Sequence, residues 1–377
     1  MAFDLRHNHE GTKKSKLTDG PRLDLALQKF DPHRFGFQRR SDAAADRTDH
    51  FWEKTLPGIG RVYFTPLSWQ HANQQTTWRH PDGTMEHISV LGMVALIQRV
   101  VWGIHIRDAI PANVLSLTSS TGGYLGVAYR AEVGFTSEGW LGFVFGLGSI
   151  DGVLESHMLA VNPELQSNSI GWHLKLLQAY EALRTGHHAM VWTFDPMRGI
   201  NANLNFNKLG VYADDFMVSK YGEFHSELYG NVPSDRFIVT WSLTAPRVHE
   251  HLRQVYAGTY TPLTWREVST LPTVDSHHTD EMLAAPPRRL RFEIPGDVDD
   301  LAQKVPERAI EWRREMRGIC TQLLDTLHPV QLDDGGPDPA QLIVRYTRGT
   351  YRVTDFVTVQ KAGQRQSAFV FTLKDET

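Results

Sequence analysis

A stretch near the middle of the chain, SHMLAVNPELQSNSIG from Ser156 to Gly171, has the residue types and spacing that bind a phosphate group. Met158–Val161 predicts an apolar strand, and a turn carrying Gln166 and Ser169 follows it before an amphipathic helix begins. Backbone N–H groups at such a turn hold a pyrophosphate together with the positive end of the helix dipole. The alternative is an ordinary strand-to-helix connection in which Ser169 only caps the helix.

Two side chains on the same strand could handle a proton. A side-chain period of two places Glu155, His157, Leu159 and Val161 on one face of the strand. The Glu155 carboxylate can act as a general base where burial raises its pKa, whereas the His157 imidazole titrates near neutral pH without help. The alternatives are a solvated strand end for Glu155 and a hydrogen-bonded core histidine for His157.

Three asparagines, Asn201, Asn203 and Asn205, lie close together in a short helix predicted over Ile200–Leu209. Asparagine is a poor residue for a helix interior, because its side chain competes for backbone hydrogen bonds. Their grouping therefore indicates a role beyond helix formation, such as contacts with amide groups of a ligand or substrate. The alternative is a frayed and exposed helical turn.

The surrounding elements predict a mixed α/β fold with helices on both faces of a sheet. The predicted strands are Glu86–Leu91, Tyr124–Val133, Trp140–Gly148, Glu155–Val161, His188–Phe194, Ala213–Lys220 and Phe237–Leu243, and the predicted helices are Met93–Trp102, Ile170–Arg184 and Ile200–Leu209. In the longest helix the apolar residues recur at helical spacing, and the polar residues Lys175, Gln178 and Glu181 are expected on the opposite side.

The turn Gln166-Ser-Asn-Ser169-Ile-Gly171 resembles motif A of the GNAT superfamily of N-acetyltransferases, where a strand precedes Gln/Arg-x-x-Gly-x-Gly/Ala. The order of elements over residues 85–245 is similar to that superfamily as well. Ser169 departs from the pattern, which has glycine at this position. The departure matters because a Cβ limits positive φ and the close approach of a ligand to the backbone. Further segments resemble a family of predicted acetyltransferases: SHMLAV (156–161), LK (174–175), WTFDP (192–196), NANLNFNKLG (201–210), YG (221–222) and SDRF (234–237).

The resemblance implies a GNAT-like core that uses acetyl-CoA or another acyl-CoA as co-substrate. The implied cofactor-binding residues are Leu159, Ala160, Val161, Gln166, Ser167, Asn168, Ser169, Ile170, Gly171, Trp172, Asn201 and Asn205. Backbone N–H groups of Leu159–Val161 would polarise the thioester carbonyl. Asp195 ends the strand that should part from the motif strand, and it is implied as a substrate contact together with Asn203; the alternative for Asp195 is a turn residue before Pro196.

The resemblance also implies catalytic roles. A glutamate at the offset of Glu155 is the catalytic base in the histone-acetyltransferase branch. The usual general acid is a tyrosine four residues before the glycine that closes the next helix, and here Phe206 stands there with no proton to give. Tyr212, Tyr221 or a water could protonate the leaving thiolate instead, although both tyrosines could equally be packing residues. The thiolate could also leave unassisted, or the reaction could differ from acetyl transfer.

Composition bounds the class of protein. The chain has 377 residues, of which 41% are hydrophobic and 22% charged, as in ordinary soluble globular proteins. The formal net charge of −4 argues against a general nucleic-acid partner. A single cysteine, Cys320, excludes an intramolecular disulfide and fits a reducing compartment. No signal peptide or apolar run of membrane-spanning length is present, so no membrane partner and a cytoplasmic location are expected.

The histidines do not predict a metal site, although the chain has 18 of them. The close pairs His187-His188, His277-His278 and His249/His251 lack the spacing of metal ligands.

Four segments are expected along the chain: an N-terminal arm and packed extension (1–84), the acyl-CoA-binding domain (85–245), a linker (246–287) and a small α+β unit (288–377). Residues 1–50 are expected to be a mobile arm, and the C-terminal unit to complete the substrate pocket or a homodimer interface.

The function that fits these features best is an acyl-CoA-dependent N-acyltransferase that acetylates a small-molecule amine by direct attack on the thioester. Two other functions keep the same fold. One is different chemistry, either an acyl-CoA decarboxylase or a transferase that uses an aminoacyl-tRNA, although the acidic net charge counts against the second. The other is a non-catalytic protein that retains an acyl-CoA site.

Overall fold

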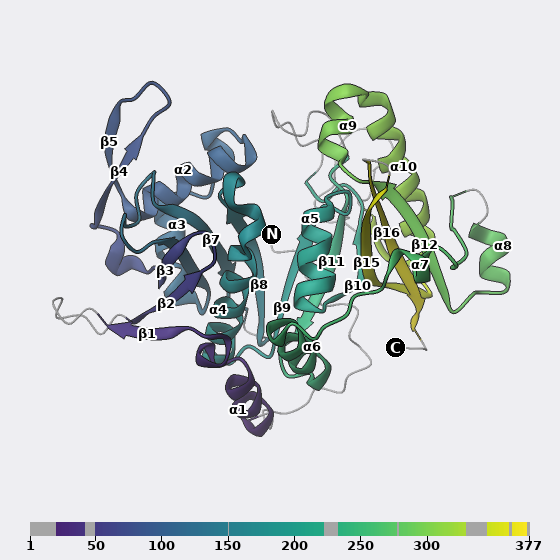
Figure 1. Cartoon of the computed structure of the whole chain (residues 1–377), viewed down its shortest axis with the longest axis horizontal. Helices are drawn as coiled ribbons and strands as arrows, with labels where there is room; N and C mark the ends of the chain where they lie inside the picture. Colours follow the sequence, from purple (N-terminus) through teal and green to yellow (C-terminus); the bar gives the residue numbers. More distant parts are fainter. Residues whose placement is uncertain are drawn as a thin grey trace.

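One mixed sheet runs through the whole molecule in the computed structural model (Figure 1). The structure describes residues 20–41, 50–149, 151–221, 233–276, 279–328, 345–361 and 364–374. The sheet has 14 strands, and its neighbours are antiparallel except for the pairs β8/β9 and β10/β13. The prediction of a mixed α/β fold is confirmed.

The strands follow one another across the sheet in an order that differs from their order in the chain. From one edge they are β1 (Gln38–Ser41), β2 (His50–Leu56), β3 (Gly60–Pro66), β6 (Tyr124–Arg130), β7 (Trp140–Leu147), β8 (Val153–Val161), β9 (Ala189–Phe194), β11 (Arg236–Ser242), β10 (Tyr212–Met217), β15 (Tyr351–Lys361), β16 (Gln364–Leu373) and β12 (Arg289–Pro295). Two short strands, β13 (Asp325–His328) and β14 (Arg345–Thr347), extend the sheet from β10. A separate hairpin pairs β4 (Gln75–Arg79) with β5 (Met85–Ser89).

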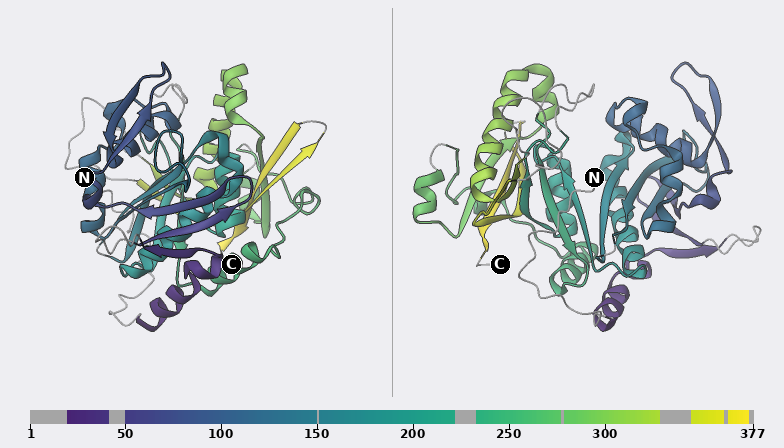
Figure 2. Two further views of the ribbon diagram at one scale, coloured as in Figure 1. Left: turned by 60° about the vertical axis from the view of Figure 1, so that its left-hand side comes forward. Right: turned by 180° about the vertical axis from the view of Figure 1, so that it is seen from behind.

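Helices cover both faces of this sheet (Figures 1 and 2). The α-helices are α1 (Gly20–Lys29), α2 (Val90–Trp102), α3 (Ala112–Ser116), α4 (Ile170–Arg184), α5 (Gly199–Ala202), α6 (Pro246–Ala257), α7 (Trp265–Val268), α8 (Thr279–Ala284), α9 (Val298–Lys304) and α10 (Pro306–Leu323). A π-helix, η6 (Asn203–Leu209), continues α5, and the 3-10 helices are η1 (Pro32–Phe35), η2 (Trp69–His71), η3 (Ile106–Asp108), η4 (Thr118–Thr121) and η5 (Pro163–Asn168).

Two apolar cores lie on opposite faces of the central strands. On one face, Leu174 and Leu177 of α4 join a large core that continues into the C-terminal strands. On the other face, Met93 and Ile97 of α2 pack with Phe143 of β7. Burying these large side chains stabilises the fold by about 1.5–3 kcal/mol for each one fully buried. The strands between α2 and α4 are therefore covered from both sides.

The N-terminal segment differs from the expected mobile arm wherever it is described. Phe30, Phe35 and Phe37 are buried in the large core, and β2 and β3 belong to the main sheet. Phe35 packs edge-on against Trp172 of α4. The sequence of neither segment alone predicts this contact. Residues 1–19 and 42–49 lie outside the described residues. This segment therefore covers the side of α4 that faces away from the sheet.

Two further expectations about elements are wrong. The strand expected first in the core forms as β5, but it pairs only with β4 in the separate hairpin. The segment expected to be a linker contains α6, α7 and α8, and Val248 and Leu252 of α6 are fully buried. Both errors arise because short polar-rich segments gain their structure from distant packing partners rather than from their own periodicity. By contrast, the helix predicted over Ile170–Arg184 forms with those bounds.

Strand β8 carries a bulge that reverses its side-chain alternation. The register against β7 shifts between the pairs Glu155/Leu147 and Met158/Phe145, so two residues of β8 oppose one residue of β7. After the bulge, Leu159 points toward the α4 side, where its Cδ2 lies 3.4 Å from the position of a Cβ on Gly171. Glu155 and His157 therefore do not share a face with Leu159 and Val161, contrary to the expectation from a regular strand.

Candidate functional site

The central feature of the sheet is a parting between β8 and β9. These parallel strands pair only at Val153/Ala189, Leu154/Met190 and Glu155/Val191. Beyond those pairs each strand remains bonded on its outer side, β8 to β7 and β9 to β11. The two halves of the sheet separate above the paired ends (Figure 1). The inner backbone edges of two interior strands are thus left open to a cavity.

Two connected cavities occupy this parting. The central cavity has a volume of about 340 Å³ and is lined by Trp102, Ile104, Asp108, Ser156, His157, Met158, Leu159, Lys175, Trp192, Thr193, Phe194, Asp195, Arg198, Asn201, Leu204, Asn205, Tyr221 and Arg236. The outer cavity, about 540 Å³, is lined by Val101, Trp102, Leu159, Val161, Ser169, Gly171, Trp172, Met197–Asn201, Asn203, Leu204, Lys208, Gly296–Val298 and Arg365. Shared residues such as Leu159 and Asn201 connect them.

The outer cavity ends at the N-terminus of α4, where the motif predicts a phosphate site. Ser169 adopts the left-handed conformation, with φ 59° and ψ 15°, although it is not a glycine. Its side chain makes no capping hydrogen bond, so the N-cap role proposed as the alternative is not what the structure shows. Its carbonyl instead accepts hydrogen bonds from the backbone N–H of His173 and from His173 Nδ1. Gly171 lines the cavity with its bare backbone.

The other motif residues occupy different places. Ile170 is fully buried in the core, and Trp172 lines the outer cavity while its Nε1 donates to the Lys208 carbonyl at 3.1 Å. Residues 166–168 form the end of the 3-10 helix η5, and the side chains of Gln166, Ser167 and Asn168 lie outside those that the structure describes.

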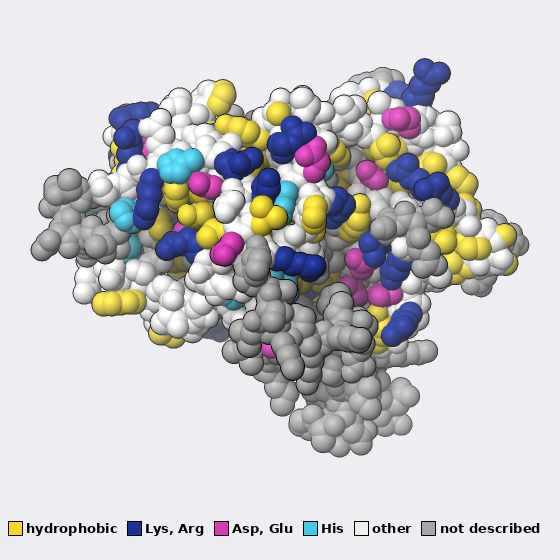
Figure 3. Space-filling model, turned by 90° about the horizontal axis from the view of Figure 1, so that it is seen from below, with side chains coloured by type: hydrophobic (Ala, Val, Ile, Leu, Met, Phe, Trp, Pro, Cys, Tyr) yellow, Lys and Arg dark blue, Asp and Glu magenta, His cyan; other side chains and the backbone are white. Residues whose placement is uncertain are grey.

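Cationic side chains gather around the outer cavity. Arg198, Lys208 and Arg365 line it, against a single acidic lining residue, Asp297, among the described ones. Arg365 and Asp297 come from the C-terminal part of the chain, so this unit helps to form the wall of the outer cavity. Basic side chains beside a helix N-terminus favour a phosphate group. On the face shown in Figure 3, by contrast, basic and acidic side chains are intermixed.

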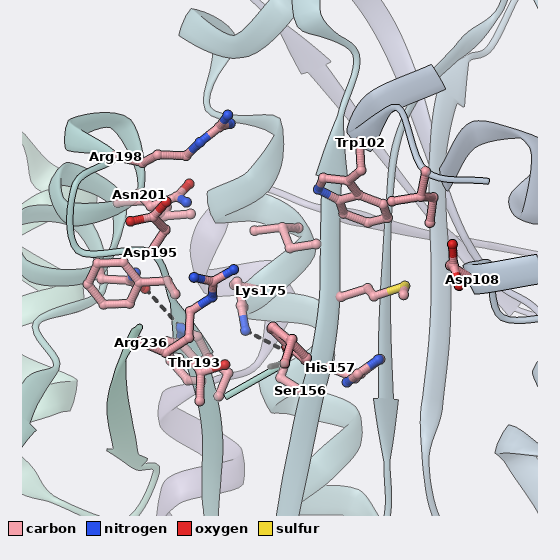
Figure 4. Close-up of a pocket in the computed structure, with 18 residues that line it drawn as sticks. Trp102, Asp108, Ser156, His157, Lys175, Thr193, Asp195, Arg198, Asn201 and Arg236 are labelled. Carbon is pink, nitrogen blue, oxygen red and sulfur yellow. Dashed lines mark hydrogen bonds between the residues drawn. The ribbon is translucent and has the colours of Figure 1, made fainter. Parts of the chain in front are cut away.

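A buried lysine lies at the wall of the central cavity (Figure 4). Lys175 is 2% exposed, and its Nζ donates to Ser156 Oγ at 2.6 Å while lying 3.7 Å from the ring centroid of Trp192. Ser156 Oγ in turn donates to Gln178 Oε1 at 2.6 Å. Burial lowers the pKa of Lys175 well below its ordinary value. No carboxylate among the described residues forms an ion pair with this amine.

Sequence reasoning placed Lys175 and Gln178 on the polar side of the helix, and this expectation is wrong. Both residues are buried, because their side chains lie on the side of α4 that packs on the sheet, where Ser156 of β8 contacts both. Ser156, whose side chain faces this helix, lies between Glu155 and His157 in the sequence, so its polar character gave no distinct signal.

Of the two expected proton acceptors, only His157 lines the cavity. His157 is exposed and projects away from Lys175 on the other side of β8 (Figure 4). Desolvation by the surrounding cavity wall lowers the pKa of His157, and the Glu155 carboxylate opposes that shift. Glu155 itself pairs with Val191 in the closed part of the sheet and is not among the lining residues.

The tyrosines expected to replace the missing acid also separate. Tyr221 lines the central cavity, with the Arg236 guanidinium over its ring. Tyr212 instead packs between Arg247 and Arg352 and is not among the lining residues of either cavity. Phe206 is 2% exposed and packs against Phe194 and Phe369.

The two residues expected to contact the substrate already form hydrogen bonds with other side chains of the protein. Asp195 lines the central cavity, but both its carboxylate oxygens accept from Arg313 of α10, at 3.1 and 2.9 Å. Burial alone would raise the pKa of Asp195, and the Arg313 guanidinium overcomes this effect and lowers it. Asn203 lines the outer cavity and accepts from Asn207.

Among the remaining expected ligand contacts, four line the cavities. Asn201 lines both, Asn205 lines the central one while accepting from Trp192 Nε1, and Leu159 lies between the two. Val161 lines the outer cavity, whereas Ala160 is buried on the α2 side of β8 opposite Phe143.

Neither a metal site nor a membrane-spanning helix is found in the described part of the chain. No group of three or more His, Cys, Asp or Glu side chains there is placed to hold a metal ion. In the same residues, none of the helices has the length and apolar character needed to cross a membrane.

Comparison with known proteins gives likeness in structure only. No protein-family model matches the sequence, and no curated protein matches it. Among solved structures, an N-acetyltransferase from Staphylococcus aureus Mu50 is 10% identical with a TM-score of 0.34, covering 48% of this chain and 98% of its own. The IAA acetyltransferase from Bacillus cereus is 12% identical with a TM-score of 0.31, covering 48% of this chain and 97% of its own.

A third similar structure is YncA from Salmonella typhimurium, which was solved with its cofactor acetyl-CoA. It is 17% identical with a TM-score of 0.30, and the match covers 41% of this chain and 84% of that protein. With identities and TM-scores this low, none of these likenesses establishes what the present chain does.

Proposed function

We propose that this chain transfers an acyl group from an acyl-CoA thioester to the amine of a small molecule. The observation that carries the proposal is the parting of β8 and β9 inside a continuous sheet. Backbone N–H and C=O groups in the interior of a sheet are costly to leave without partners. The pantetheine arm of coenzyme A is an extended chain with two amides, so it can bond to both open strand edges, as an added strand does.

The outer cavity supplies a place for the phosphates of the same molecule. The N-terminus of α4 presents unpaired backbone N–H groups, and Arg198, Lys208 and Arg365 add positive charge around it. Gly171 lets the backbone approach a phosphate without an intervening Cβ. An anionic cofactor headgroup at this end would direct the pantetheine toward the central cavity.

The central cavity then receives the thioester and the acceptor. The acceptor nitrogen attacks the carbonyl carbon, a C–N bond forms, and the C–S bond breaks with its electron pair going to sulfur. Backbone N–H groups along Leu159–Val161 would stabilise the oxyanion that develops on the carbonyl. The cavity volume of about 340 Å³ fits an acyl group together with a small acceptor.

Calorimetry with acetyl-CoA, malonyl-CoA, succinyl-CoA and free coenzyme A tests the binding part of the proposal. We expect saturable binding and a matching rise in melting temperature through linkage. Gly171→Val should weaken binding at least about tenfold, because its side chain would fill the approach to the helix end. Lys208→Gln should weaken it less and reduce its salt dependence, whereas Lys29→Gln, an exposed lysine of α1, should not.

Thiol release in the presence of a panel of primary amines tests the transfer part. Appearance of free coenzyme A with formation of the amide by mass spectrometry supports acyl transfer. Loss of CO2 from malonyl-CoA with formation of acetyl-CoA and no free thiol, or binding without turnover of any acyl-CoA, would contradict it. Absence of coenzyme A binding by the folded wild-type protein would overturn the whole proposal.

A further inference from the structure

The buried lysine on α4, Lys175, is not needed to hold the neighbouring side chains in place. Lys175 uses one hydrogen bond, to Ser156 Oγ, and contacts the face of Trp192. Ser156 and Gln178 would remain bonded to each other without it. A methionine of similar length would fill the same volume without desolvating an amine. A buried amine with no acidic partner among the described residues is costly, and such arrangements are a mark of functional sites.

The position of this amine in the parting is specific. Ser156 is the first residue of β8 beyond the last pair with β9, and Trp192 is the first such residue of β9. Lys175 Nζ touches both, so it lies at the point where the strands begin to separate. A pantetheine arm that enters from the α4 N-terminus and follows the open edges would bring its thioester toward this point.

We propose that Lys175 carries the proton of the transfer reaction, taking it from the attacking amine and delivering it to the sulfur of the leaving coenzyme A. This inference rests on the proposed acyl transfer. The attacking nitrogen loses a proton to Nζ as the C–N bond forms, and the thiolate takes that proton as the C–S bond breaks. Lys175 ends the cycle as the neutral amine, so no further reactant is required.

One shuttling group accounts for two departures from the expected site. Glu155 is not among the lining residues of the central cavity, and Phe206 cannot donate a proton. Burial lowers the pKa of Lys175, which increases the share of the neutral amine that can accept a proton. Ser156 Oγ fixes the direction of Nζ, because it receives one Nζ proton while donating its own to Gln178.

The charged and titratable groups around this amine come from several elements. Those that line the same cavity are Asp108 in η3, His157 on β8, Asp195 after β9, Arg198 before α5, Tyr221 after β10 and Arg236 on β11. Asp195 is already paired with Arg313. A pH profile measured on the wild type must therefore be read against the same profile of a Lys175 variant.

Lys175→Met and Lys175→Arg test the inference with acetyl-CoA and the best amine of the panel. Both should lower kcat by about 10²- to 10⁴-fold, because methionine has no basic nitrogen and a guanidinium does not give up its proton. Both should bind coenzyme A within about threefold of wild type. The ascending limb of the wild-type pH profile should disappear in Lys175→Met. Lys54→Met is the control, because it removes another partly buried lysine whose pKa is lowered. Lys54 lines neither cavity, so this variant should keep full activity.

Two measurements remain decisive if turnover is slow or a variant is unstable. The 13Cε shift of Lys175 in 13C-lysine-labelled wild-type protein reports its charge, and a lysine still charged at pH 9 would overturn the inference. Mass spectrometry after incubation with acetyl-CoA alone should find Lys175 unmodified, since an acetylated Lys175 would make it the nucleophile instead.

The outcomes separate the two proposals. Wild-type turnover that survives Lys175→Met contradicts only the role of Lys175, whereas a wild type that does not bind coenzyme A contradicts the proposed function. Lys175→Met should also unfold at the same or a higher temperature than wild type. A large loss of stability in that variant would indicate a structural role and would count against the proposal.

Discussion

Asp195 and Arg313 form a two-point ion pair across 118 residues of sequence, and both side chains are buried. Asp195 follows β9 at the wall of the central cavity, and Arg313 lies in the middle of α10. The pair fixes the C-terminal helix against the strand that forms one side of the parting. Asp195 Oδ1 also accepts from the backbone N–H of Met197, so the turn leading into α5 is held by the same carboxylate.

Removal of this arginine should strongly destabilise the protein. Arg313→Met leaves a buried carboxylate without its charge partner, which we expect to cost about 3–5 kcal/mol of unfolding free energy. Asp195→Asn in the same chain should recover part of that loss, since the uncompensated charge is gone. Urea denaturation measures both. Arg308→Met, on the same helix but in an exposed pair with Glu311, should cost less than about 1 kcal/mol.

A small effect of Arg313→Met, similar to that of Arg308→Met, would contradict this account of the pair. So would a double variant that is less stable than Arg313→Met alone, because it would mean that the Asp195 carboxylate is satisfied by other groups.

Local patterns in the sequence were enough to predict the elements that position the site. The helix over Ile170–Arg184 and the apolar strand before it follow from hydrophobic spacing and from the residues that end them. The same patterns could not predict that β8 contains a bulge. A bulge depends on the register against β7, and it decides that Leu159 and His157 point to opposite sides of the sheet.

Parts of the site that depend on distant packing were not predictable from local patterns. Lys175 has the spacing of a solvated helix residue, but its amine lies against Ser156 of β8 and Trp192 of β9. Asp195 looks like a free carboxylate until Arg313 reaches it. The partner of Asp195 is 118 residues away, and those of Lys175 are on two other elements, so short-range periodicity carries no information about either environment.

Ser169→Gly should be more stable than Ser169→Ala by about 1 kcal/mol, which reverses the usual order for a helix. The reason is the φ of 59° at this position, which glycine adopts freely and a residue with a Cβ adopts at a cost. The Ser169 side chain makes no cap bond that either variant would lose. At exposed Arg314, inside α10, the alanine variant should be the more stable of the two. Thermal and urea unfolding would reveal a normal order at Ser169 if the strain is absent.

Stability should fall as the pH is lowered from about 6.5 to about 4, partly because of His173. Burial lowers the pKa of His173 to about 4, and the nearby Lys54 charge adds to this effect. Above pH 6.5 the ring is neutral in both states; below it the unfolded chain binds a proton that the folded chain refuses, until the folded pKa is reached. The difference between a pKa of 6.5 in the unfolded chain and about 4 in the folded chain is worth about 3.4 kcal/mol at most.

His173→Gln should remove that part of the pH dependence while leaving the rest. Melting temperatures between pH 7.5 and 4.5 measure it, with His80→Gln on the exposed β4–β5 hairpin as the matched control. Parallel curves for His173→Gln and wild type would show that the histidine does not contribute.

Phe206→Tyr should not restore the acid that is usual in the superfamily the chain resembles. The Phe206 ring lies in the core between Phe194 and Phe369, at centroid distances of 6.1 and 6.0 Å, and it is not among the lining residues of either cavity. A phenolic hydroxyl added there would be buried among aromatic rings without a hydrogen-bond partner, which should lower the free energy of unfolding by about 1–3 kcal/mol. We therefore expect lower stability and no gain in kcat. Phe51→Tyr, on the partly exposed strand β2, controls for the added hydroxyl and should change stability by less than about 0.5 kcal/mol. A rise in kcat for Phe206→Tyr with unchanged stability would instead mean that this side chain reaches the thioester when coenzyme A is bound.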